Sequence, residues 1–357
     1  MRKDLQQTRW LSIAIGWAIA LGAAALASPA PLPMYFDRYD RDAGLSQLAV
    51  HTIAQDATGF IWLGTEDGLD RFDGYTFTHS ARHTDEPGSL PNGFVADVQP
   101  DASGALWIAT DGGGVARQNP VTGRFEPLPT PGPAVARAGL ERVRCLLFDH
   151  AGQLWIGTRD EGLARFDPRS RRIGRLRHAS GDAASLASDS IFALLEDRQH
   201  TMWIGTAEGL DRIEAGAHGL TRQPLPVPQP TAVRALLEDR SGALWAGTTA
   251  GLVRLDRATR ATRLFRHDAA DASSLPADGV NALLEDRAGR LWIGTVSGLA
   301  LLDAARGTFS VYKHDPADPR SLPDDHIVSL HEDRGGLIWV GTKFGGLAKP
   351  CSVLAGW

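Results

Sequence analysis

The segment GRLWIGTVSGLALLD, residues 289–303, has near-copies along most of the chain. Three of them read GFIWLGTEDGLDRFD (59–73), GQLWIGTRDEGLARFD (152–167) and GALWAGTTAGLVRLD (242–256). The tryptophan of this phrase recurs every 42–48 residues, at Trp62, Trp107, Trp155, Trp203, Trp245, Trp292 and Trp339. A phrase held in register seven times at this period indicates a repeat architecture.

Each copy predicts four short strands. In residues 280–315, VNALLEDR and RLWIGTV are β-rich runs separated by a turn, and GLALLDAA and TFSVYKHD follow. Six copies of the first turn carry Asp first and Gly fourth, a type I preference, whereas DRQH (197–200) lacks the glycine and predicts a looser turn. The second connection, T-x-x-G-L, places glycine where a hairpin needs positive φ.

Four-stranded units of this length predict an all-β fold, a seven-bladed β-propeller of antiparallel blades. The seven tryptophans are interpreted as core between blades, because stacked blades must fill the space between their sheets. The last copy lacks an outer strand, and residues 34–40 match that strand in other copies. We therefore predict a propeller over residues 34–349, closed by the N-terminal strand completing blade seven.

Composition and the first residues bound the compartment and the partners. The chain of 357 residues is 43% hydrophobic, 22% charged and has a net charge of −5, so it is globular and no nucleic-acid partner is expected. Its two cysteines, Cys145 and Cys351, form no metal-binding spacing or disulfide framework. Residues 1–27, with a basic start and an apolar run, predict a signal peptide and a periplasmic protein. An uncleaved membrane anchor is the alternative.

The repeats resemble the two-component regulator propeller family, through units such as VNALLEDRAGRLWIGTVSGLALLD and the loops SSLP (273–276) and RSLP (320–323). The resemblance implies an extracytoplasmic sensor of a bacterial hybrid histidine kinase or diguanylate cyclase. Such sensors carry a second propeller, a membrane helix and the output domain. Residues 350–357, PCSVLAGW, depart from that plan, and we interpret them as an aberrant tail of a truncated or frameshifted sensor. The chain is then no enzyme by itself, because the output lies in the missing region.

No motif for catalysis or cofactor binding is recognised, and none is expected. The closest histidine pairs, His79 with His83 and His326 with His331, fall in strand-and-loop sequence, so no metal site is expected. The repeated Glu-Asp pairs are interpreted as turn residues, since a catalytic pair is needed once and not in every blade. RSRRIGRLRH (169–178) reads as the solvated outer strand of blade three.

The start of each first strand is where the repeats stop being alike. The position after the first core residue holds His51, Ala96, Arg144, Phe192, Arg234, Asn281 and Val328. These residues should share one end of the central channel with the loops between second and third strands. The ligand-binding candidates are His51, Arg144, Arg234, Asn281, Arg159 and Lys343. Arginines there suit a small polar or anionic ligand, carbohydrates included.

Three functions follow from this reading, and fold alone decides between none of them. The first is a ligand-sensing propeller acting through a membrane signalling partner. The second is a secreted enzyme of the streptogramin-lyase type, for which His51 with Glu66 is the one hint of a non-repeated His/Glu cluster. The third is a protein-interaction scaffold. The simpler alternative to a binding site is that the varied residues at this end of the channel are only solvated.

Overall fold

Strands follow one another in groups of four along the chain. The computed structural model describes residues 34–101, 103–129, 139–216 and 219–351, and these contain strands and turns but no helix. Accordingly, this part of the chain offers no helix that could cross a membrane. The predicted signal peptide and most of the predicted tail lie outside the described residues.

Each blade consists of four strands, counted outward from the axis of the ring. The first strands are β2 (Thr52–Gln55), β6 (Val95–Pro100), β10 (Val143–Phe148), β14 (Ile191–Glu196), β18 (Val233–Glu238), β22 (Val280–Glu285) and β26 (Ile327–Glu332). The second strands are β3 (Ile61–Gly64), β7 (Leu106–Thr110), β11 (Leu154–Thr158), β15 (Met202–Thr206), β19 (Leu244–Thr248), β23 (Leu291–Thr295) and β27 (Ile338–Thr342). The third strands are β4 (Leu69–Phe72), β8 (Gly114–Gln118), β12 (Leu163–Phe166), β16 (Gly209–Ile213), β20 (Gly251–Leu255), β24 (Gly298–Asp303) and β28 (Leu347–Pro350). The outer strands are β5 (Phe77–Ser80), β9 (Phe125–Pro127), β13 (Ile173–Leu176), β17 (Leu220–Gln223), β21 (Thr262–Phe265), β25 (Thr308–Tyr312) and β1 (Phe36–Tyr39).

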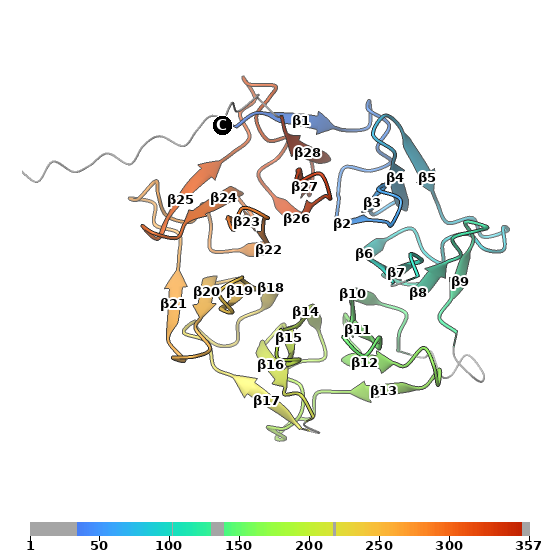
Figure 1. Cartoon of the computed structure of the whole chain (residues 1–357), viewed down its shortest axis with the longest axis horizontal. Helices are drawn as coiled ribbons and strands as arrows, with labels where there is room; N and C mark the ends of the chain where they lie inside the picture. Colours follow the sequence, from blue (N-terminus) through green and yellow to red (C-terminus); the bar gives the residue numbers. More distant parts are fainter. Residues whose placement is uncertain (1–33, 102, 130–138, 217–218, 352–357) are drawn as a thin grey trace, which may run out of the picture. The chain divides into compact units, whose positions relative to one another are not determined.

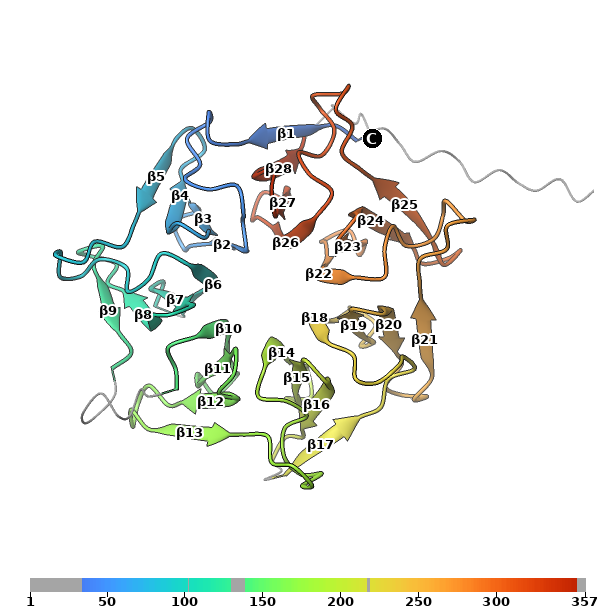
Figure 2. The ribbon, with the colours of Figure 1, turned by 180° about the vertical axis from the view of Figure 1, so that it is seen from behind.

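The seven antiparallel sheets form a ring, which confirms the predicted propeller (Figures 1 and 2). The strand β1 completes blade seven by pairing with β28, Phe36 opposite Pro350 and Tyr39 opposite Leu347. The pairing continues past the predicted end of the propeller, since the Cys351 N–H donates to the Tyr35 carbonyl at 2.7 Å. The first and last segments of the chain are thereby held in one sheet.

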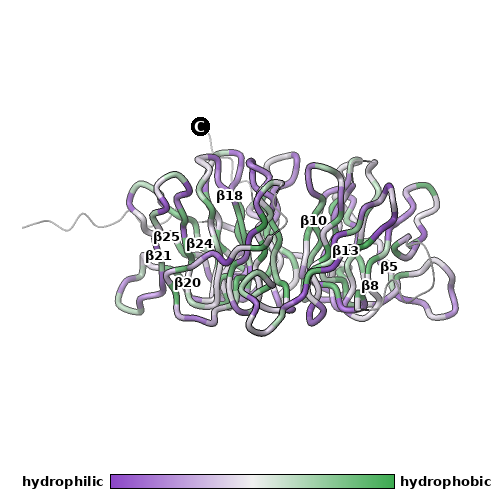
Figure 3. The backbone as a smooth tube through the Cα atoms, turned by 90° about the horizontal axis from the view of Figure 1, so that it is seen from below, coloured by the Kyte–Doolittle hydropathy of each residue, from purple (hydrophilic) through white to green (hydrophobic). Residues whose placement is uncertain are grey.

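The core lies between the blades and consists of seven similar clusters. Trp292 of blade six packs with Ile327 and Ile338 of blade seven, and Trp339 of blade seven packs with Val50 and Ile61 of blade one. The other five tryptophans lie in the same way between their own blade and the next. Seen from the side, the strands between the two faces of the ring are accordingly rich in hydrophobic residues, and hydrophilic loops lie at both faces (Figure 3).

The glycine that follows the tryptophan by two residues lets neighbouring blades approach closely. At Gly294, a Cβ atom would lie 2.7 Å from Cγ2 of Ile327 in the next blade, closer than real contacts permit. The glycine of the second connection serves a different need. Gly298 has φ of +134°, in the range that L-residues avoid, as the sequence predicted for this hairpin.

We call the end of the ring that carries the Asp-first turns the turn face. At each turn the aspartate carboxylate bonds both the backbone of the turn and the indole of the tryptophan. Asp286, for example, accepts hydrogen bonds from the Arg290 N–H at 2.9 Å and from Trp292 Nε1 at 2.9 Å. The turn at 197–200 was expected to be looser, and this prediction was wrong. Asp197 accepts from Trp203 Nε1 at 2.6 Å, and the His200 N–H donates to the Asp197 carbonyl at 2.8 Å. His200 takes the left-handed conformation, φ +61°, in place of glycine.

The Glu-Asp-Arg triplets join the blades at the turn face. The Arg240 N–H donates to Glu285 Oε2 of the next blade at 2.9 Å, and Arg240 Nη1 donates to the Arg287 carbonyl at 2.7 Å. We call this pair of bonds, from the arginine N–H and from its side chain to the next blade, the arginine clamp. It also links blades four to five, six to seven and seven to one, through Arg198, Arg287 and Arg334. The repeated carboxylates therefore have structural partners, in agreement with their interpretation as turn residues.

Candidate ligand-binding site

The opposite end of the ring, where the first strands begin and the loops between second and third strands lie, is the channel mouth. In blades two to seven, each loop is held against the start of its blade by a backbone hydrogen bond. The Arg159 N–H donates to the Arg142 carbonyl at 2.9 Å, and the Lys343 N–H donates to the His326 carbonyl at 2.8 Å. This repeated contact places both sets of candidate residues at the same end of the ring.

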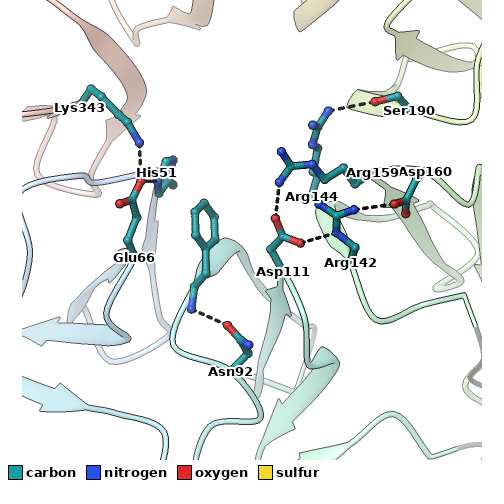
Figure 4. A network of polar contacts seen from close by, with 11 residues as sticks. His51, Glu66, Asn92, Asp111, Arg142, Arg144, Arg159, Asp160, Ser190 and Lys343 are labelled. Carbon is teal, nitrogen blue, oxygen red and sulfur yellow. Dashed lines mark hydrogen bonds and ion pairs between the residues drawn. The ribbon is translucent and has the colours of Figure 1, made fainter.

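Arg159 belongs to an ion-pair cluster shared by blades two and three (Figure 4). Its Nη1 lies 2.6 Å from Asp111 Oδ2, and Arg142 Nε lies 3.1 Å from the other oxygen of Asp111. Arg142 also reaches Asp160 Oδ2 at 2.7 Å. Burial raises the pKa of Asp111, but hydrogen bonds from the two arginines outweigh it and hold the pKa below its usual range. Arg159 is thus neutralised by its neighbours, which makes it a weaker anion-binding candidate than expected.

Arg144 has a different environment, although it lies beside that cluster. Its Nη1 donates to Ser190 Oγ at 3.2 Å, and its guanidinium lies 4.2 Å from the ring centroid of Phe192 in the next blade. Among the described residues it forms no ion pair. Burial, together with the nearby charge of Arg159, lowers its pKa, which marks a cation held without a compensating carboxylate.

Arg234 and Asn281 lie side by side on the first strands of blades five and six. Arg234 Nη1 donates to Asn281 Oδ1 at 3.0 Å, and Asn281 Nδ2 donates to the Ile327 carbonyl at 3.0 Å. Arg234 Nε is buried without a hydrogen-bond partner among the described residues. The sequence candidates Arg234 and Asn281 are therefore in contact, and the guanidinium again lacks a carboxylate.

His51 and Lys343 meet at Glu66, on the junction of blades seven and one (Figure 4). His51 Nε2 lies 3.2 Å from Glu66 Oε1, and Lys343 Nζ pairs with the same oxygen. Burial lowers the pKa of His51, which favours the neutral imidazole, although the bond to Glu66 opposes this. The hydrogen bond from Lys343 holds the pKa of Glu66 below its usual range. The ring of Phe94 stacks on His51 with centroids 4.7 Å apart.

The mouth therefore divides into paired and unpaired cations. Lys343, Arg142 and Arg159 each have a carboxylate within ion-pair distance. Arg144 and Arg234 have hydroxyl, amide or aromatic partners instead. Phe192 occupies the position between them in the order of the blades. Two guanidinium groups flanking an aromatic ring can bind an anionic group and a ring-shaped ligand together.

The sequence analysis missed Phe94 and Arg142 as members of the mouth. Both immediately precede the first core residue of their strand, Val95 and Val143, and so lie two positions before the column that was compared. Extending the comparison to the residue before the first core residue would have included them. Of the histidine pairs noted in the sequence, His79 Nδ1 bonds Asp70 Oδ1 at 2.8 Å, and His326 lies edge-on to Phe344.

A hollow of about 970 Å³ lies away from the mouth, where blade four meets the first turn of blade five and the turn after its third strand. Arg257 at its wall is paired with Asp197 at 3.0 Å and Glu238 at 3.1 Å. Arg212, also in the wall, pairs with Glu214 at 3.1 Å. Because these two cations already have carboxylate partners, we favour the mouth as the ligand site.

Comparison with known proteins identifies the repeats. Five segments match the family model described as two component regulator propeller: residues 44–67, 139–160, 185–208, 274–297 and 321–344. A stretch of 34 residues is 59% identical to a histidine kinase of Formosa agariphila, covering 10% of this chain and 2% of that protein.

Solved structures share the fold. The extracellular domain of the hybrid two component system BT3049 from B. thetaiotaomicron superposes with a TM-score of 0.76 at 23% identity, over 89% of this chain and 42% of that one. This chain thus spans about two-fifths of the length of that sensor domain. Virginiamycin B lyase from Staphylococcus aureus gives a TM-score of 0.67 at 12% identity, over 89% of this chain and 99% of the lyase. Five segments of this seven-bladed ring are therefore similar to the two component regulator propeller repeat.

Proposed function

We propose that this propeller is the ligand-sensing part of an extracytoplasmic bacterial signalling system, and that it binds a small anionic ligand at the channel mouth. The observation that carries the proposal is the pair Arg144 and Arg234. Each is partly buried, and neither forms an ion pair among the described residues. Burying a cation without a counter-ion is unfavourable, so a ligand that supplies the anion gains binding energy from both.

The rest of the mouth supports a saccharide bearing a carboxylate or sulfate. Phe192, in the blade between those of the two arginines, offers the ring face that Arg144 does not cover, and Asn281 offers an amide oxygen and nitrogen beside Arg234. Sugar rings need one apolar face and several hydrogen-bonding groups. The repeat family and the sensor domains of similar fold favour signalling as the use of such binding. The signal would pass to a membrane-bound histidine kinase or diguanylate cyclase, and the basic, apolar leader favours the periplasm.

Calorimetry on the full chain with glucuronate and glucose 6-sulfate tests the site, with glucose as the neutral comparison. We expect binding of the acidic sugars only. The double variant Arg144→Ala with Arg234→Ala should weaken it by at least about 100-fold, since each charged hydrogen bond contributes about 1.5–3 kcal/mol. Arg169→Ala with Arg172→Ala removes the same charge from the exposed edge of blade three and should leave binding unchanged. Unchanged affinity in the first double variant would refute the assignment of the site.

A second candidate function rests on the cluster of His51, Glu66 and Lys343. A neutral imidazole bonded to a carboxylate can act as a general base, the arrangement expected of a lyase or hydrolase at the mouth. Incubation with a polyuronate and chromatography of the products would test it. Turnover that is lost in His51→Ala while sugar binding persists would establish an enzyme, and no turnover would leave sensing as the function.

A further inference from the structure

Three potential metal ligands meet at the turn face, on the junction of blades three and four. His150 lies in the turn after β10, Glu196 ends β14, and His200 is the last residue of the turn that follows. One ligand atom from each can be chosen so that all three lie within 4.8 Å of one another. His150 is 46 residues from Glu196, so spacing within one repeat could not reveal the cluster, although Glu196 and His200 are close in sequence.

The geometry directs both imidazoles to one carboxylate oxygen. His150 Nδ1 bonds Glu196 Oε1, and His200 Nδ1 lies 3.3 Å from the same oxygen. The other oxygen of Glu196 accepts from the His150 N–H at 2.7 Å, which fixes the orientation of the carboxylate. The two imidazole rings are close and tilted, with centroids 3.8 Å apart and an interplanar angle of 31°. His150 and His200 side chains are 54% and 49% exposed, so an ion can enter from solvent.

Both histidines depart from the repeat: the position of His200 is otherwise constant, and the position of His150 holds arginine in four copies and alanine in two, Ala57 and Ala102. The position of His150 holds arginine at the four clamped junctions, as in Arg198 and Arg240. The position of His200 holds glycine in the other six turns, namely Gly59, Gly104, Gly152, Gly242, Gly289 and Gly336. His200 adopts the glycine-like φ of +61°, which costs a non-glycine residue about 1 kcal/mol or more. Two unusual residues in neighbouring blades thus converge on one carboxylate, at the expense of backbone strain.

The other described histidines mostly have assigned partners. His178, His267 and His314 occupy equivalent loops, and each bonds a leucine carbonyl at 2.7 Å. These three histidines recur at equivalent positions, so the repeat accounts for them. His150 and His200 occur together once, so the repeat does not account for them.

We infer that His150, Glu196 and His200 form a site for a divalent transition-metal ion of the zinc type. Two imidazole nitrogens and one carboxylate oxygen are a donor set that Zn²⁺ takes, with a fourth position left for water. Zinc binds an unprotonated ring nitrogen, so in the neutral imidazole of His150 the proton lies on Nε2, and the ion takes the place of the hydrogen bond between Nδ1 and Glu196. It would join blades three and four, where His150 stands in place of the clamping arginine. A plain histidine–glutamate hydrogen bond is the competing explanation, and the experiment separates the two.

Calorimetric titration of the full chain with Zn²⁺ tests the inference, on protein without a polyhistidine tag, stripped with chelator and carrying Cys351→Ser. We expect one ion per chain and a melting temperature that rises with Zn²⁺. His200→Gly restores the residue of the other turns, so it should fold as well as the parent. It should nevertheless bind Zn²⁺ at least about 10-fold more weakly, as should His150→Ala.

His83→Ala, which removes an exposed histidine elsewhere, is the matched control and should bind as the parent does. Absence of stoichiometric binding in the parent would overturn the inference. Equal affinity in the parent, His200→Gly and His150→Ala would also overturn it, because the ion would then be bound elsewhere. If His200→Gly proved poorly folded, His150→Ala alone would decide between the two outcomes.

Discussion

The two ends of the ring are organised by opposite principles. At the turn face the same atoms make the same contacts from blade to blade, such as the turn aspartate with the tryptophan Nε1 and the arginine with the next carbonyl. At the channel mouth the equivalent position holds histidine, alanine, arginine, phenylalanine, asparagine or valine. The backbone repeats at the mouth as well, because six first strands share a register shift at this position, so the difference lies in the side chains.

This contrast separates structural residues from candidate functional ones without any alignment. A contact needed to hold a blade is needed in every blade, and its residues recur. A ligand is bound once, so its residues do not recur. His150 and His200 satisfy the second description although they lie on the turn face, which is why they stand out there.

The largest expected effect on stability is at the repeated core. Trp292→Ala should lower the free energy of unfolding by about 3–5 kcal/mol, because it leaves a cavity between blades six and seven and removes the bond to Asp286. Urea denaturation measures this. Tyr75→Ala, at a side chain 92% exposed, is the aromatic control and should change stability by under about 0.5 kcal/mol. Similar losses in the two variants would contradict the role of the tryptophans.

The turn carboxylates should make the ring sensitive to acid. Burial raises the pKa of Asp286, but hydrogen bonds from Trp292 and Arg290 outweigh it, so the folded-state pKa is lowered. The stability contributed by ionised Asp286 is therefore present above about pH 4 and is lost as the pH falls through the lower folded-state pKa. Asp286→Asn should cost about 1–3 kcal/mol at pH 7.

Denaturation at pH 7 and in acid distinguishes this effect from a general one. The gap between Asp286→Asn and the parent should narrow as the pH falls below about 4, because the parent loses the same charge. Asp85→Asn, at an exposed carboxylate, should show no gap at either pH. A gap that stayed constant with pH would show that the turn depends on shape and not on the ionised carboxylate.

The arginine clamps should contribute less. Arg287→Ala removes bonds to the carbonyls of Arg334 and Asp333, 2.7 and 3.0 Å long, and should lower stability by about 1 kcal/mol. Arg306→Ala removes an exposed arginine paired with Asp303 in its own blade, and should cost under about 0.5 kcal/mol. Equal small effects would show that blades are held by the tryptophan clusters alone.

The smallest expected effect on stability is at the mouth. Arg144→Ala with Arg234→Ala should change the free energy of unfolding by under about 1 kcal/mol, because no ion pair is lost, and the lost stacking on Phe192 and hydrogen bonds to Ser190 and Asn281 are offset by relief of two partly buried cations. The same variant should have the largest effect on binding of acidic sugars. A stability loss above about 2 kcal/mol would instead assign these arginines to the structure.

The fold could be predicted from sequence because each blade repeats the same core and turn residues. Tryptophan, Gly-Thr and the Asp-first turn carry local information, and ring closure follows from one missing outer strand. The candidate site was predicted in part. Arg234 with Asn281, and His51 with Lys343, do meet, and Glu66 joins the second pair. Arg159 proved to be neutralised by Asp111, a partner from the neighbouring blade that sequence comparison within the repeat could not supply.

By itself, the sequence determined the number of blades, their four strands, the closing strand and the end of the ring at which the repeats diverge. These depend on residues within one repeat and on its periodicity. Only the tertiary structure decided which cations at the mouth lack counter-ions, and only it brought His150, Glu196 and His200 together. The physical reason is that those contacts cross from one blade to the next, between residues about one repeat apart. Their partners are set by how the sheets pack and not by local preference.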